Sequence, residues 1–177
     1  SSQDNSLKLQ KMDINGNILF PSLINHPLPN WVYINDESFE ICPDGALAYA
    51  FQYYGSDSVN HILVNYLDSS GQAIWANPVD FVAEECNSLA FEAANGFWLS
   101  WINSSGYWPN DQVFTTKVNL DGSLAFTPLA ISGDGSDKLF PVISAYENKA
   151  VVCWNDQSGM LNGIKTQVIT NTGSIMQ

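Results

Sequence analysis

The chain has 177 residues, of which 45 % are hydrophobic and 12 % aromatic, so it holds enough apolar material for a packed core. Eighteen acidic residues stand against six lysines and no arginine, which gives a formal net charge of −12. This charge excludes nucleic acid as an expected partner, because phosphate binding depends on clustered Lys and Arg. It also disfavours docking on an anionic membrane.

No run of residues approaches the ~18 consecutive apolar positions that a membrane-spanning helix requires, so we expect no membrane insertion. Residues 1–9 lack the basic and apolar regions of a signal peptide, and any export signal is expected to have been removed. An acidic surface rich in Asn and Ser and free of Arg is typical of a strongly hydrated exterior. We therefore expect a secreted protein, either extracellular or at the cell surface.

A repeat with a glycine at a fixed place runs through the chain. The glycines of its four copies are 55, 51 and 51 residues apart, and they are Gly16, Gly71, Gly122 and Gly173. A second register agrees with the first, because aromatic residues lie 20, 21 and 19 residues before the last three glycines, at Phe51, Trp101 and Trp154. Two coincident registers indicate a structural repeat.

Within each repeat the apolar residues alternate with a period of two, as at 46–51, 96–101 and 149–154, which indicates strands. The last repeat predicts four antiparallel strands, at 141–146, 150–155, 164–170 and 174–177. Asn-Gly and Asp-Gly pairs between the strands supply the positive φ angles that tight hairpins demand.

This pattern predicts an all-β fold, a β-propeller segment of four-stranded antiparallel blades of about 51 residues. We expect one partial propeller with a half-blade at 7–23 and full blades at 31–78, 79–128 and 129–177. Phe51, Trp101 and Trp154 are expected to pack between blades. Propellers close with about four to eight blades, so this segment should not close by itself. Remaining blades of a longer protein, a second copy or another partner would cover its open ends.

The repeated turn carries a recognisable motif, D-x-x-G-x-x-x-W/F. It occurs as Asp13/Gly16/Phe20, Asp68/Gly71/Trp75 and Asn119/Gly122/Phe126, while the fourth copy departs from it with Thr170 and Gln177. The chain thereby resembles the blade repeats of extracellular bacterial β-propeller proteins of the Bacteroidetes type. The resemblance implies the fold and a bacterial, extracellular location, but no activity. The sialidase Asp-box differs in the spacing of its acid and aromatic, so no sialidase site is expected.

The sequence shows no catalytic or metal-binding signature, and we expect no enzyme and no cofactor. His26 and His61 have no Cys, His or acid at ligand spacing, and adjacent Glu84 and Glu85 would point to opposite faces of an extended strand. The segment 133–137 resembles a calcium loop but lacks the distal Glu, which leaves calcium there as an open alternative.

The candidate ligand-binding residues lie in the loops between the second and third strands of each blade. They combine aromatic side chains with carboxylates and amides, and they are Tyr53, Tyr54, Asp57, Asn103, Tyr107, Trp108, Asn110, Asp111, Asn155 and Asp156. We predict a protein-interaction or scaffolding module. The alternative is a carbohydrate-binding module, because aromatic rings stack on sugars while amides and carboxylates bond hydroxyls. Part of a glycoside hydrolase or lyase is a third hypothesis.

Overall fold

The computed structural model describes residues 6–20, 23–27, 35–83, 85–92, 95–104, 111–133, 135–158 and 161–176. Within these residues the chain is all-β, with no helix, and its strands pair antiparallel in one two-stranded and three four-stranded sheets. The four strands of each larger sheet follow one another in chain order. This confirms the all-β, antiparallel part of the prediction.

The three larger sheets are named here I, II and III. Sheet I consists of β3 (Asn35–Ile41), β4 (Leu47–Tyr54), β5 (Asn60–Leu67) and β6 (Val79–Val82). Sheet II consists of β7 (Glu85–Glu92), β8 (Gly96–Ser104), β9 (Asp111–Val118) and β10 (Leu129–Ala130). Sheet III consists of β11 (Asp137–Tyr146), β12 (Lys149–Ser158), β13 (Leu161–Thr170) and β14 (Ile175–Met176).

The fourth strand of a sheet extends further along the chain than the sequence pattern indicated. After the Gly71 turn, Ala73 makes one bridge to Leu67, and the strand pairs again only at β6, beyond the boundary expected at residue 78. Sheet II repeats this arrangement with a bridge at Leu124 and with β10, beyond 128. The gap in strand pairing between Ala73 and β6 contains Trp75, whose large side chain is buried against the neighbouring sheet.

The N-terminal pair, β1 (Ser6–Leu9) and β2 (Ile24–Pro27), has the same register as the last two strands of sheet I. Leu9 pairs with Ile24, seven residues before and eight after Gly16, and Val64 pairs with Val79 at the same offsets from Gly71. The pair is therefore the third-and-fourth-strand half of one repeat, with bounds slightly wider than the predicted 7–23.

The turn at each repeat glycine closes in the same way. The amide of the residue three before the glycine bonds the carbonyl of the residue one after it, and the glycine amide bonds back to that first residue. At the first turn the Asp13 carboxylate also accepts bonds from the amides of Asn15 and Asn17, and Thr170 Oγ1 accepts from Ser174 at the last. Thr170 therefore supplies a side-chain acceptor as Asp13 does, whereas at the third turn Asp121 accepts from the Ser123 amide and Asn119 donates to the Ser123 hydroxyl.

Three core clusters lie between successive sheets, and one repeat aromatic lies in each. Phe51 packs with Leu9 of the N-terminal pair, Trp101 packs with residues of sheet I, and Trp154 packs with residues of sheet II. Each aromatic therefore points toward the preceding sheet. The predicted packing role of these three residues is confirmed.

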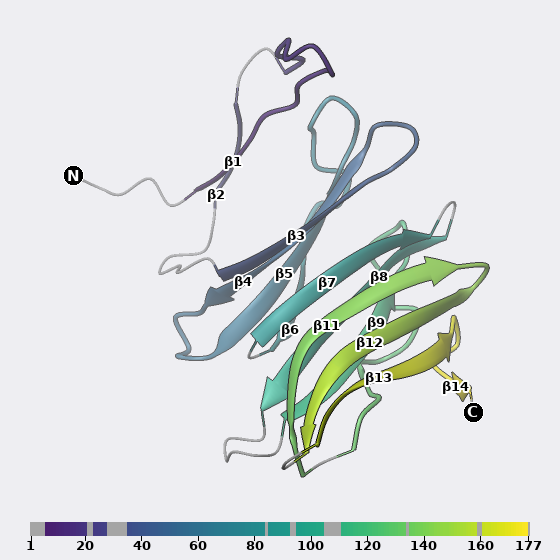
Figure 1. The fold of residues 1–177 in the computed structure, drawn as a ribbon. Helices are drawn as coiled ribbons and strands as arrows, with labels where there is room; N and C mark the ends of the chain where they lie inside the picture. The colour runs from purple at the N-terminus through teal and green to yellow at the C-terminus, as the bar shows by residue number, and fades with distance from the viewer. Residues whose placement is uncertain are drawn as a thin grey trace.

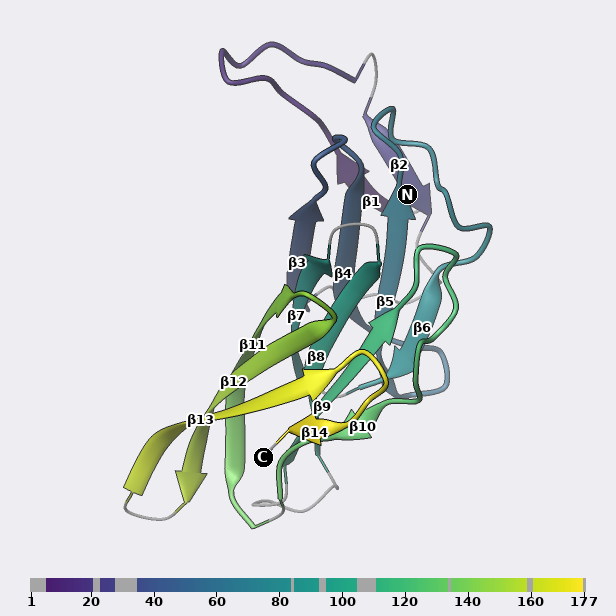
Figure 2. The same cartoon turned by 90° about the vertical axis from the view of Figure 1, so that its right-hand side faces the viewer.

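The sheets are fanned in chain order, with the N-terminal pair beside sheet I and the C-terminus on sheet III at the opposite end (Figure 1). The first strands β3, β7 and β11 lie side by side along one edge of this stack (Figure 2). The described sheets do not close into a ring.

Candidate functional site

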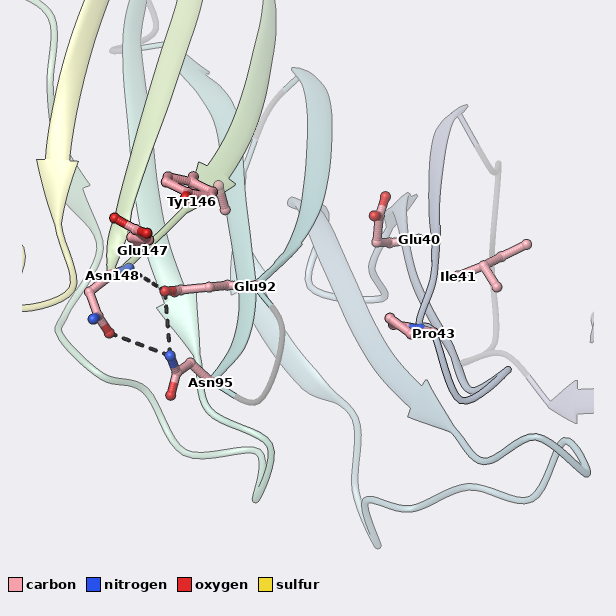
Figure 3. A pocket seen from close by; sticks show the side chains of 9 residues that line it. Glu40, Ile41, Pro43, Glu92, Asn95, Tyr146, Glu147 and Asn148 are labelled. Carbon is pink, nitrogen blue, oxygen red and sulfur yellow. Dashed lines mark hydrogen bonds between the residues drawn. The ribbon is translucent and has the colours of Figure 1, made fainter.

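A cavity of about 770 Å³ lies at the ends of the three first strands. Its walls come from the ends of β3, β7 and β11 and from the turns that follow them, and its lining residues are Glu40, Ile41, Pro43, Glu92, Asn95, Ala145, Tyr146, Glu147 and Asn148. In Figure 3 the residues of β3 lie on one side of the opening and those of the β11–β12 turn on the other, with Glu92 of β7 between them.

Glu92 is buried at the back of this cavity and is fully bonded. Lys117 Nζ donates to its carboxylate at 2.7 Å and Trp98 Nε1 at 2.9 Å, while the amide of Asn148 donates to the second oxygen. Burial raises the pKa of Glu92, but the hydrogen bonds from Lys117 and Trp98 outweigh burial, and the net pKa is lowered. Glu92 is thus a structural anion and not a proton donor at neutral pH.

The bond from Glu92 to Asn148 also stabilises the β11–β12 turn. Glu147 and Asn148 are its two central residues, with φ of 46° and 65°. A two-residue hairpin of this kind needs positive φ at both positions, which is costly for a residue such as Glu. Since the Glu92 carboxylate holds the Asn148 amide, sheet II fixes the turn that forms one wall of the cavity.

The rim of the cavity combines apolar and acidic side chains. Ile41 is 72 % exposed and Tyr146 is 74 % exposed, which is unusual for residues of their size. Glu40 and Glu147 lie beside them, and Glu147 is exposed. Tyr146 and Glu147 therefore border the opening on one side and Glu40 on the other, while the Ile41 side chain lies on the side of β3 away from Glu92 (Figure 3).

The loops that carry the candidate ligand-binding residues leave the sheets at the end opposite to this cavity (Figure 1). Tyr53 is buried, whereas Tyr54 and Asp57 are exposed. Asn103, Asp111, Asn155 and Asp156 are half-buried at the ends of their strands. Tyr107, Trp108 and Asn110 lie outside the described residues. Three different sheets carry these residues, and none of the described ones lines the cavity at the first strands.

His61 lies between two acids, although the sequence was interpreted as giving it no acid at ligand spacing. Its Nε2 lies 3.0 Å from Asp57 Oδ2 and its Nδ1 lies 3.1 Å from Asp80 Oδ1. Tyr53 stacks on the imidazole at 5.0 Å and donates to Asp80 at 2.7 Å. Asp80 comes from β6, which pairs with β5, so only the fold brings it to His61.

This cluster ties the β4–β5 loop to the fourth strand. The hydrogen bond with His61 lowers the pKa of Asp57, whereas burial and the bond to Asp80 raise the pKa of Tyr53. Both ring nitrogens of His61 face carboxylates, so neither is available as a general base toward a ligand. The cluster explains why Tyr53 is not an exposed contact residue.

The segment 133–137 already faces a buried cation of the protein itself. The ammonium of Lys138 donates to the Ser136 carbonyl at 2.7 Å and to its hydroxyl at 2.8 Å. The Ser136 hydroxyl donates to Asp156 at 2.7 Å. Asp134 lies outside the described residues. A fixed positive charge beside this loop opposes calcium binding there.

Sequence reasoning missed the cavity because its residues come from the ends of three strands and the turns after them, which only the packing of three sheets brings together. The one available signal was the Glu-Asn pair after 146, which is unusual for a two-residue hairpin. In the described residues, no group of three or more His, Cys, Asp or Glu is arranged to hold a metal ion. No helix in this part of the chain is long and apolar enough to cross a membrane.

Comparison with protein families gives no match to any family model, and comparison with curated proteins gives none either.

Proposed function

We propose that this chain is a segment of a bacterial, extracellular β-propeller that acts as a non-enzymatic protein-interaction module. Three successive four-stranded sheets in one repeat register, each packed on the last through a large aromatic, support the propeller. The −12 net charge and the absence of Arg support a location outside the cell.

The cavity at the ends of the first strands is the proposed binding surface, and the exposed Tyr146 beside it is the observation that carries this proposal, with exposed Ile41 on the outer side of the opposite wall. Large apolar side chains that rim a concavity are typical of protein-binding sites. The acidic rim, with Glu40 and Glu147, favours a partner segment that carries Lys or Arg beside apolar residues.

The pKa shifts of the carboxylates differ from those that a glycoside hydrolase needs. In the described part of the chain, each carboxyl group whose pKa is shifted has a lowered value, namely Asp13, Asp57, Asp68, Glu92 and Asp121. A glycoside hydrolase needs one carboxyl group with a raised pKa to protonate the leaving group.

The test is selection of a displayed random-peptide library on the whole chain. We expect enrichment of peptides that combine basic and apolar residues, with affinities that fall as salt is raised. Tyr146→Ser should weaken binding by about tenfold or more, because an exposed tyrosine that a partner covers carries much of an interface's energy. Tyr54→Ser is the matched control, since it removes an exposed tyrosine from the opposite end of the molecule.

Carbohydrate binding by the loops is the second candidate, and the exposure of Tyr54 beside Asp57 favours it. Titration with a panel of oligosaccharides decides between the two. Saccharide binding that is lost in Tyr54→Ser and kept in Tyr146→Ser would replace the protein-binding proposal, as would a library selection that enriches nothing.

A further inference from the structure

The outer surface of the N-terminal pair is exposed where the same surface of every other repeat is buried. Met12 lies four residues before its glycine and is 62 % exposed. The residues at that position in the other three repeats are Leu67, Val118 and Ile169, and each is fully buried. Because all four residues are apolar, the difference in exposure arises from what surrounds each residue and not from the type of residue.

Each of the three buried residues has a cross-strand partner, and no described strand supplies such a partner to Met12. Each lies opposite a residue of the second strand of its sheet, in the pairs Leu47–Leu67, Phe97–Val118 and Ala150–Ile169. In the described part of the chain, β1 pairs with β2 alone. None of the described strands therefore pairs with the edge of β1 that corresponds to the second-strand side.

The turn at Gly16 is also uncovered, whereas an aromatic ring covers the turn glycine in later repeats. A Cβ built on Gly122 would lie 3.3 Å from the ring of Trp75, and one built on Gly173 would lie 2.9 Å from the ring of Phe126. Each of these aromatics belongs to the preceding repeat, four residues after its glycine. Around Gly16 nothing lies within 4 Å of such a Cβ, and the apolar side chains beside it, Ile14, Ile18 and Leu19, are exposed.

We propose that this surface is an interface for one further unit of the same repeat. That unit supplies a β-hairpin whose second strand pairs antiparallel with β1 and places an apolar residue opposite Met12. It also supplies an aromatic side chain that packs on Gly16. The interfaces between sheets I and II and between II and III, built from the equivalent residues, define this occupant and its register.

A second copy of this chain fits the surface less well. Its last turn has Gln177 at the position of the packing aromatic, and its Trp75 and Phe126 already cover glycines of their own chain. The proposal concerns the open end of the stack and is independent of what the cavity at the first strands binds.

The test replaces residues 1–4 by one further repeat of the chain's own sequence. A copy of residues 60–110 is joined to Asn5, which lies eleven residues before Gly16 as residue 111 lies eleven before Gly122. The copied Phe97 then falls opposite Met12, and the copied Trp75 falls on Gly16. Phe97→Lys in the copied repeat is the control, because it places a charge at the interface.

The readout is oxidation of Met12 by peroxide, with Met176 at the opposite end as the internal reference. We expect Met12 to oxidise about tenfold more slowly in the extended chain, because oxidation follows exposure, and at the original rate in the control. A peptide with the sequence of residues 85–104, added to the unextended chain, should also slow Met12 oxidation, which gives a second measurement if the extended chain does not fold.

Two results would overturn the proposal. If Met12 oxidises at the rate of the unextended chain both in the extended chain and in the presence of the peptide, β1 does not pair with such a hairpin. Protection of Met12 that rises with the concentration of the unextended chain, together with a doubled mass in light scattering, would identify a second copy as the occupant.

Discussion

Trp101 is the residue that joins sheets I and II. Its ring stacks on Phe81 of sheet I at 5.4 Å and on Phe114 of its own sheet at 5.8 Å, and it is 2 % exposed. Its indole N–H is buried without a hydrogen-bond partner, and the same is true of Trp154 at the equivalent position. These tryptophans are therefore held by ring packing alone.

Replacement of Trp101 by Ala should lower the free energy of unfolding by about 3–5 kcal/mol, because it removes a buried ring from an interface between sheets. Trp101→Phe should cost clearly less, since the lost N–H has no partner. Urea unfolding of the three proteins measures both values. A near-neutral Trp101→Ala would contradict the packing role.

Replacement of Glu92 by Gln should destabilise the protein by about 3–5 kcal/mol at neutral pH, because Lys117 is left as a buried charge without a counter-ion. Lys117→Met added to Glu92→Gln should recover part of the loss. Thermal unfolding of the single and double variants tests this, and an equal loss in both would mean that the ion pair is not the cause.

The pH dependence of the same pair has a definite sign. The pKa of Glu92 is lowered on folding, so its stabilisation is complete above the unfolded pKa of about 4.3 and is lost as pH falls through the lower folded value. The stability difference between wild type and Glu92→Gln should therefore be constant from pH 7 to 5 and shrink below about pH 4. Denaturant titrations across this range give the difference directly.

At the scale of one element, the repeated turn depends on its glycine for two separate reasons. Gly16 and Gly122 have φ of 82° and 84°, so both positions favour glycine on backbone grounds. Of these two, Gly122 also lies under an aromatic ring, because Trp75 packs on it and donates from Nε1 to the Leu120 carbonyl at 2.9 Å.

These two positions allow the backbone and packing contributions to be separated. Gly16→Ala should cost about 1 kcal/mol, the price of a left-handed conformation for Ala. Gly122→Ala should cost about 2–3 kcal/mol, because the new methyl group also displaces Trp75. Unfolding measurements on both variants test the difference, and equal losses would mean that Trp75 adapts without cost.

For the whole molecule, position in the stack decides which faces are buried. Ile62 and Ile164 lie nine residues before their repeat glycines, on the face that points to the next sheet. Ile62 is fully buried against sheet II, whereas Ile164 on the last sheet is 71 % exposed. The same residue at the same repeat position thus has opposite surroundings.

Ile62→Ala should therefore lower the free energy of unfolding by about 2–5 kcal/mol, and Ile164→Ala by no more than about 0.5 kcal/mol. Equilibrium unfolding in urea compares the pair under identical conditions. A large loss for Ile164→Ala would mean that the outer face of sheet III is covered in solution.

Much of the fold was predictable because its determinants are local. Alternation of apolar residues predicted the strands, Asn-Gly and Asp-Gly predicted the hairpins, and the spacing of Phe51, Trp101 and Trp154 predicted packing between repeats. The candidate site was predicted less well. The loops were recognised as polar and aromatic, but Tyr53 is buried in the core cluster that contains Phe51, and its hydroxyl donates to Asp80, which strand pairing brings there.

The sequence by itself determined the repeat, its strands and the residues that pack between its units, because these depend on short-range pattern and on turn chemistry. Only the tertiary structure decided where carboxylates meet other groups, as Glu92 meets Lys117 and Asn148 from two other strands or turns. It also decided which of the equivalent residues in successive repeats are buried, since burial depends on the neighbouring strand or sheet and not on the residue type. Met12 and Leu67 have the same place in the pattern and differ only in what lies opposite them.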